Sequence, residues 1–298
     1  GVPGRGDTGA MERWRAARRQ ERAGRVRGAR DTGPRATDLA AEVQGEHGPW
    51  VVLMPGLGMG AEAWDEVAAD LARDHRVVRY DRPGLGRARA ERVAEPHLHD
   101  EVAHLRRVVH EVVPDPARVW LVAHSMARFM AEAYLRSDPH RVAGLVAVDG
   151  SVEEDPRLRW PVEDDLRHAL AAGLGWLPLV GRRVRSALLE DAGYTRMAAE
   201  LLRLRRALPL PAVPMVLVVA ARPWEPGSRR WVRRQRHLAQ RHRVELRRTR
   251  PGEPLPRIRT VVVPDSGHLV MRDQPTRLAA MVRAAVAAGP VPGETGWG

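Results

Sequence analysis

One serine, Ser125, stands where the chain could present a nucleophile. It follows the apolar run 118–123, whose valines favour a strand, and it precedes the helical pattern of 126–135. A serine at the apex of a strand, a sharp turn and a helix has a strained backbone, so the residues two positions away must be small. Ala123 and Ala127 meet this requirement. The stretch is therefore typical of a nucleophilic serine.

This stretch resembles the nucleophile elbow of the α/β-hydrolase family, in particular that of its small serine hydrolases. The common form is G-x-S-x-G, whose two glycines are alanines here. A serine hydroxyl needs a base that removes its proton. The loop that ends in Ser266-Gly267-His268 matches the family's histidine loop, so the resemblance, which extends over about residues 39–288, assigns His268 as that base.

A carboxylate is needed to hold the imidazole in the right tautomer. The family places it after one of the two strands that follow the elbow strand. Asp149, at the end of the first, is the preferred candidate, and Glu225, after the second, is the alternative. Asp265 ranks third, because it lies only three residues before His268 and is expected to brace that loop.

A glycine-rich loop follows the apolar run 50–54, with glycines at 56, 58 and 60. A dinucleotide site would need G-x-G-x-x-G before a helix, and a P-loop would need G-K-[ST]; neither spacing is present. In the family that the chain resembles, this loop faces the active site. The resemblance assigns the backbone N–H groups of Leu57 and Met126 as the oxyanion hole.

Two arginines need an interpretation of their own. The turn D-R-x-G-x-G-R at 81–87 also resembles the family, and we expect it to be structural, with Asp81 and Arg82 paired locally. Arg128 stands where the family usually has glycine, and the helix dipole disfavours a cation there. It is expected either to point to solvent or to bind a carboxylate on the substrate.

Strands that alternate with helices must position these residues. Apolar runs predict strands at 50–54, 76–80, 118–123, 141–148, 213–220 and 258–263, with a weaker one within 37–44. Helical spacing predicts helices over 64–72, 99–113, 126–135 and 274–288. This alternation predicts an α/β fold with a doubly wound, mostly parallel sheet. Each candidate site residue follows a strand, as expected in such sheets.

The chain divides into four predicted segments. Residues 1–36 are an Arg- and Gly-rich, disordered segment without the apolar middle of a secretory signal, so a cytoplasmic protein is expected. Residues 37–150 and 211–298 form the two parts of the hydrolase core. Between them, residues 151–210 read as helices broken by proline and glycine, which predicts a small helical cap.

The composition narrows the function classes. Basic residues outnumber acidic ones by 49 to 37, which gives a net charge of +12, but every cation is an arginine and they are spread over the whole chain. We therefore expect a solvated surface and no nucleic-acid partner. The absence of cysteine excludes disulfides and a cysteine nucleophile. No apolar run is long enough to span a bilayer.

The four histidines at 97, 99, 104 and 110 lack the spacing of a metal motif, so they are expected to be exposed helix residues, and neither a metal nor a cofactor is predicted. The sequence thus predicts a serine hydrolase that acts on a small acyl substrate, most naturally a carboxylic ester. The alternative is a catalytically weak or inactive protein of the same fold that binds a small apolar ligand. The oligomeric state is left open.

Overall fold

The computed structural model describes residues 39–88, 92–153 and 181–289. Its strands are β1 (Glu42–Gln44), β2 (Trp50–Met54), β3 (Arg76–Arg79), β4 (Val119–His124), β5 (Val142–Val148), β6 (Met215–Ala220) and β7 (Ile258–Val263). They form one sheet in the order β1-β3-β2-β4-β5-β6-β7, in which β1 runs antiparallel and the other six are parallel. The predicted α/β fold with a mostly parallel sheet is confirmed.

The helices fill the connections between the strands. They are the 3-10 turns η1 (Ala61–Trp64) and η2 (Pro139–Arg141), and the helices α2 (Asp65–Leu71), α3 (Leu98–Val112), α4 (Ala127–Ser137), α6 (Arg182–Ala207), α7 (Ser228–Thr249), α8 (Val270–Asp273) and α9 (Pro275–Ala287). The predicted helices appear within a few residues of their expected ends. Helix α7 was not predicted from the sequence. Its buried face combines the apolar Leu238, Ala239 and Leu246 with the polar Gln235 and His242, so the helical pattern of apolar residues is interrupted.

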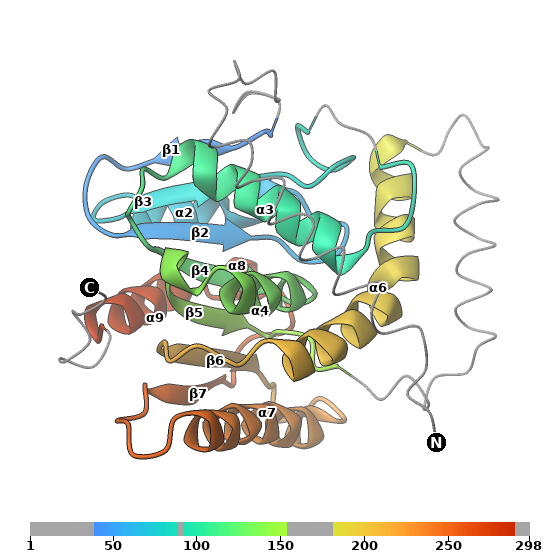
Figure 1. Cartoon of the computed structure of the whole chain (residues 1–298). Coiled ribbons are helices and arrows are strands. Elements are labelled where there is room, and N and C mark those ends of the chain that lie inside the picture. The colour runs from blue at the N-terminus through green and yellow to red at the C-terminus, as the bar shows by residue number, and fades with distance from the viewer. Residues whose placement is uncertain (1–38, 89–91, 154–180, 290–298) are drawn as a thin grey trace, which may run out of the picture. The chain divides into compact units, whose positions relative to one another are not determined.

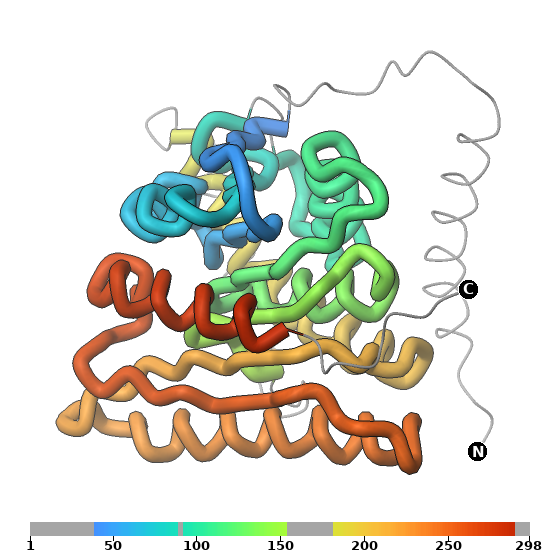
Figure 2. Tube along the Cα trace, turned by 90° about the vertical axis from the view of Figure 1, so that its left-hand side faces the viewer, coloured from blue at the N-terminus to red at the C-terminus, as the bar shows by residue number. Residues whose placement is uncertain are grey.

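The core explains why the central strands are almost wholly apolar. Every residue of β4 is buried, as expected for a parallel strand that is covered on both faces. On one face, η1, α2, α8 and α9 pack against the strands in one apolar cluster. Helices α3 and α4 pack against each other, and α7 lies along β6 and β7 at the end of the sheet (Figure 2).

Helix α6 lies beyond the carboxyl ends of the parallel strands, where the site residues are expected (Figure 1). It belongs to the predicted cap, 151–210, whose residues 154–180 lie outside the described residues, as does the predicted N-terminal segment. The division into core and cap stays a prediction. Among the described helices, none is long and apolar enough to cross a membrane.

Candidate active site

The turn after β4 holds Ser125 in a strained conformation. Its φ is +52°, in the left-handed region that residues with a Cβ seldom adopt. The Ser125 N–H donates to the carbonyl of Val148 at 3.1 Å, which ties the turn to the neighbouring strand β5. Ala123 and Ala127, on either side, are fully buried, so a larger side chain at either position would have no space. This strained conformation presents the Ser125 hydroxyl at the N-terminal end of α4.

The structure brings together three residues from different loops. Nε2 of His268 lies 3.1 Å from the Ser125 hydroxyl, and its Nδ1 lies 2.6 Å from Oδ2 of Asp149. A carboxylate only accepts hydrogen bonds, so Nδ1 carries the proton that is donated to Asp149. Nε2 is then left as an acceptor for the Ser125 O–H. This arrangement can take a proton from the serine as it attacks.

Asp149 is held in place by two further donors. The indole N–H of Trp231 lies 2.6 Å from Oδ1, and the N–H of Ala220 lies 3.1 Å from the same oxygen. Its backbone φ is +42°, and the residue is 5% exposed. Trp231 comes from α7, the helix that sequence reasoning did not predict, so its part in the site was missed as well.

The other two carboxylates that the sequence offered lie elsewhere. Glu225 is exposed and pairs with Arg222 at 3.2 Å. Asp265 is also exposed, and its backbone carbonyl accepts a bond of 3.5 Å from Gln274. Neither is the carboxylate that contacts His268.

The histidine loop is braced by Asp273, which sequence reasoning missed. Its Oδ2 accepts the N–H of Gly267 at 2.7 Å. On the other side, Nε2 of His124 lies 2.9 Å from the carbonyl of His268, and burial lowers the pKa of His124 to about 4. A neutral His124 can donate to that carbonyl without placing a second charge beside the base. The side chain of His124 thus supports the histidine loop.

The glycine-rich loop lies against the elbow. A Cβ on Gly56 would lie 2.5 Å from Nδ1 of His124 and 3.2 Å from Cβ of Ser125, so only glycine fits there. This contact brings the loop that carries Leu57 against the elbow. Within the described residues, neither the N–H of Leu57 nor that of Met126 donates to a protein acceptor. Both groups can therefore donate to an oxygen of a substrate.

Arg82 corrects one expectation from the sequence. The turn at 81–87 forms, but Arg82 does not pair with its neighbour. Asp81 instead accepts the N–H groups of Ala61, at 2.6 Å, and Arg87, at 2.8 Å. The guanidinium of Arg82 pairs with Glu190 of α6 at 2.7 Å, and both side chains are fully buried. Sequence alone could not find this pair because its members are 108 residues apart.

The structure also corrects the expectation for Arg128. It does not point to solvent, because it is 2% exposed and lies within a buried network. Its guanidinium binds Glu132 and Glu153, each at 2.7 Å, and donates to the carbonyl of Ser151. Arg205 of α6 binds the same two carboxylates. Arg128 thus offsets buried negative charge and joins the elbow helix to α6.

Replacing Arg128 by methionine is therefore expected to affect stability and to leave substrate choice unchanged. Removing one partner of a buried charge network costs about 3–5 kcal/mol, because the remaining carboxylates lose part of their compensation. Urea denaturation measures this loss in the free energy of unfolding. The ratio of kcat/KM for a neutral and an acidic p-nitrophenyl ester should equal that of the wild type. An unchanged stability with an altered ratio would contradict this assignment.

Buried histidines give the fold a dependence on pH. His104 was expected to be exposed, but it is buried, with Nε2 at 3.2 Å from the carbonyl of Asp81. His242 of α7 is also buried, 3.8 Å from Glu132. Burial lowers the pKa of each from 6.5 to about 4. As the pH falls, the unfolded chain therefore binds protons before the folded one does.

We expect the free energy of unfolding to be highest above about pH 6.5 and to decrease as the pH falls toward 4. The loss can reach about 3 kcal/mol for each of His104, His242 and His124, because burial lowers the pKa of all three to about 4. Urea denaturation at a series of pH values measures the slope. His104→Gln, which can still donate to the Asp81 carbonyl, should reduce the slope by the amount that corresponds to the uptake of about one proton on unfolding. A stability that stays constant across this window would show that the buried histidines are already charged.

His97 and His99, which were expected to be exposed, are half-buried and lie near a carboxylate of α6. His97, His99 and Glu200 each place one ligand atom within 4.8 Å of the others, the one such group of three among the described residues. Both oxygens of Glu200 already accept bonds, from Nδ1 of His97 at 2.7 Å and from the N–H of Leu98 at 2.7 Å. These contacts favour a structural role, in which Glu200 joins α6 to the start of α3.

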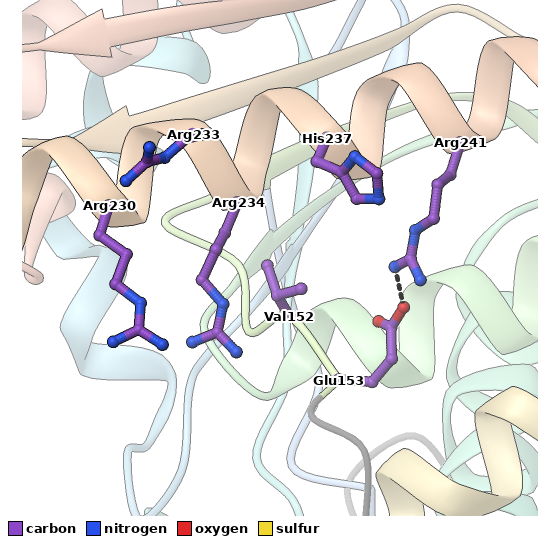
Figure 3. Close-up of a pocket in the computed structure, with 7 residues that line it drawn as sticks. All are labelled: Val152, Glu153, Arg230, Arg233, Arg234, His237 and Arg241. Carbon is purple, nitrogen blue, oxygen red and sulfur yellow. Dashed lines mark hydrogen bonds and ion pairs between the residues drawn. The ribbon is translucent and has the colours of Figure 1, made fainter.

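A hollow of about 460 Å³ lies between α7 and the segment that follows β5 (Figure 3). Arg230 and Arg234 extend side by side from α7 toward that segment, and Arg241 pairs with Glu153. Among the described residues of the lining, most of the basic side chains are exposed, and the one carboxylate, Glu153, is already bound by Arg128 and Arg205. The hollow is thus an open cationic surface beside the site.

Comparisons with known proteins agree with the fold. A family model described as "Alpha/beta hydrolase family" matches residues 51–281. The abhydrolase domain-containing protein lid-1 of Caenorhabditis elegans is 29% identical over 114 residues, which cover 36% of this chain and 30% of that protein. A pimeloyl-[acyl-carrier protein] methyl ester esterase of Sodalis glossinidius is 33% identical over 112 residues, covering 37% of this chain and 40% of that protein. The chain thus spans less than half of these relatives.

Among solved structures, a thermophilic esterase from Thermogutta terrifontis with malate bound has a TM-score of 0.59. It is 20% identical and covers 84% of this chain and 93% of that chain. At this identity the likeness shows the shared fold alone.

Proposed function

Since the chain belongs to the alpha/beta hydrolase family, we propose that it is a serine hydrolase that cleaves carboxylic esters or related acyl compounds through an acyl-enzyme. The observation that carries the proposal is the chain of hydrogen bonds Ser125–His268–Asp149, at 3.1 and 2.6 Å. The contacts of Glu225 and Asp265 with other groups favour Asp149 as the acid.

The reaction has two halves. His268 takes the hydroxyl proton of Ser125 as the oxygen attacks the acyl carbon, and Asp149 stabilises the imidazolium that forms. The N–H groups of Leu57 and Met126 bind the negatively charged oxygen of the tetrahedral intermediate. His268 then gives its proton to the leaving alcohol. A water molecule, activated by the same histidine, attacks the acyl group and releases the acid and the free serine.

An ester is the preferred substrate class for two reasons. An alcohol leaves more readily than an amine, so an ester asks less of the general acid than an amide does. The named activity of one relative, a methyl ester esterase, points to the same class.

The other candidate is a protein that keeps the fold and binds an apolar ligand without turnover. Its support in the sequence was the pair of alanines at the elbow, Arg128 and the uncertain acid. Of these, Arg128 is occupied in a buried network and an aspartate contacts His268, so two of the three supports are lost.

Stopped-flow hydrolysis of p-nitrophenyl acetate tests the proposal. An acyl-enzyme predicts a burst of p-nitrophenol close to one equivalent of enzyme, followed by slower turnover. Thioester, lactone and anilide substrates, compared by kcat/KM, then define the acyl class. Saturable binding of the ester without release of p-nitrophenol would favour the ligand-binding protein.

A further inference from the structure

The loop that carries Leu57 is held from behind by one arginine. Arg82 donates from Nη1 to the carbonyl of Pro55 at 2.5 Å and from Nη2 to the carbonyl of Gly56 at 2.6 Å. The C=O of Gly56 and the N–H of Leu57 belong to one planar trans peptide unit, so they point in opposite directions. Fixing the Gly56 carbonyl on Arg82 therefore fixes the direction of the Leu57 N–H.

The next peptide unit is held by Glu190, which comes from α6. The N–H of Gly58, which shares a peptide plane with the C=O of Leu57, donates to Oε2 of Glu190 at 2.8 Å. The same carboxylate accepts bonds from Nε and Nη2 of Arg82 at 2.7 and 2.9 Å. Both peptide units that flank the Cα of Leu57 are thus tied to one ion pair.

Burial makes this ion pair a rigid support. Arg82 and Glu190 are both fully buried, so their two-pronged pairing is shielded from salt and from competing water. Although burial by itself lowers it, the carboxylate of Glu190 raises the pKa of Arg82, which therefore stays charged. Arg92 lies behind the pair, 3.2 Å from Glu190 and 2.7 Å from Glu101. The charges of the cluster are compensated within it.

Helix α6 also packs directly against the loop at 55–60 and the turn at 81–87. A Cβ on Gly58 would lie 2.8 Å from Cβ of Ala187, and one on Gly84 would lie 1.9 Å from Oγ of Ser186. Both glycines have a positive φ, +66° and +79°, so they are required by conformation as well as by space. Ala187 of α6 thus packs against the loop that carries Leu57.

We propose that Glu190 is a positioning residue of the oxyanion hole: through Arg82 it aims the Leu57 N–H at the acyl oxygen, and it links that N–H to α6. The inference rests on the proposed function for the use of this donor. It also explains why the turn at 81–87 carries an arginine. An aimed donor acts on the charge that develops in the transition state, so its loss lowers kcat more than it raises KM.

Glu190→Gln tests the role most sharply. The amide keeps an oxygen for the Gly58 N–H but removes the negative charge that holds Arg82. We expect kcat for p-nitrophenyl acetate to fall about 10²-fold, close to the loss of one oxyanion donor, while KM stays within about threefold. Hydrogen–deuterium exchange, followed by mass spectrometry, should become faster over residues 55–60.

Glu200→Gln is the matched control. Glu200 lies on the same helix, and its carboxylate also accepts a backbone N–H, that of Leu98, but at the start of α3. This variant should keep the wild-type kcat and the wild-type exchange over 55–60. Loss of catalysis through general loosening of α6 would instead appear in both variants.

A double variant, Arg82→Met with Glu190→Met, keeps the test decisive if the single variant unfolds, because it leaves no buried charge unpaired. It should fold and show the same loss of kcat and the same faster exchange. Wild-type kcat and wild-type exchange in a folded variant would overturn the inference. If the wild type shows no hydrolysis that depends on Ser125, the proposed function fails, and the exchange over 55–60 alone decides whether Glu190 holds the loop.

Discussion

Ser125→Ala is expected to lower kcat for ester hydrolysis by about 10⁴- to 10⁶-fold. The substitution removes the attacking oxygen and nothing else, since the two oxyanion donors are backbone groups and His268 keeps its bond to Asp149. The same loss is expected for His268→Ala, and the double variant should lose no more than either single one, because the two residues act as a unit.

Steady-state hydrolysis of p-nitrophenyl acetate by the three variants measures these effects, with circular dichroism as the control for folding. Any residual rate should show no burst. Retention of a substantial fraction of wild-type kcat in a folded Ser125→Ala protein would assign the hydrolysis to another group.

Asp149→Asn is expected to lower kcat by up to about 10⁴-fold. Oδ1 of Asp149 accepts two N–H groups, those of Trp231 and Ala220, so the replacing amide must place its oxygen there. Its NH₂ group then faces Nδ1 of His268, which can only accept. The proton moves to Nε2, and the histidine can no longer take the proton of Ser125.

Glu225→Gln is the matched control for this prediction, because it makes the same kind of change at the alternative acid. Glu225 pairs with Arg222 on the surface, so kcat should stay within about twofold of the wild type. The two variants, assayed side by side, identify the acid. The reverse result, a small effect at Asp149 and a large one at Glu225, would contradict the proposed triad.

Local pattern was enough to predict the strands and Ser125, and the resemblance to the α/β-hydrolase family added His268 and Asp149 as candidates. A parallel strand buried on both faces must be apolar throughout, and β2 shows this in Trp50–Met54 without interruption. The elbow needs small residues around its serine, and Ala123 and Ala127 supply them. The position of each candidate after a strand then follows from the geometry of a parallel sheet.

The contacts that support these groups could not be predicted from local sequence pattern. Arg82 and Arg128 look like surface cations in a chain with so many arginines, and their burial depends on partners far along the sequence, such as Glu190. Trp231 sits on a helix whose arginines obscure its apolar stripe. Asp273 braces the histidine loop from the next helix. Each of these is a contact that only the folded chain creates.

The most direct test of an activated nucleophile is labelling with a fluorophosphonate probe, located by mass spectrometry. We expect one modified residue, Ser125, with labelling lost in Ser125→Ala and in His268→Ala and strongly slowed in Asp149→Asn. Wild-type protein that is folded and yet unlabelled, or labelled equally well without His268, would contradict it.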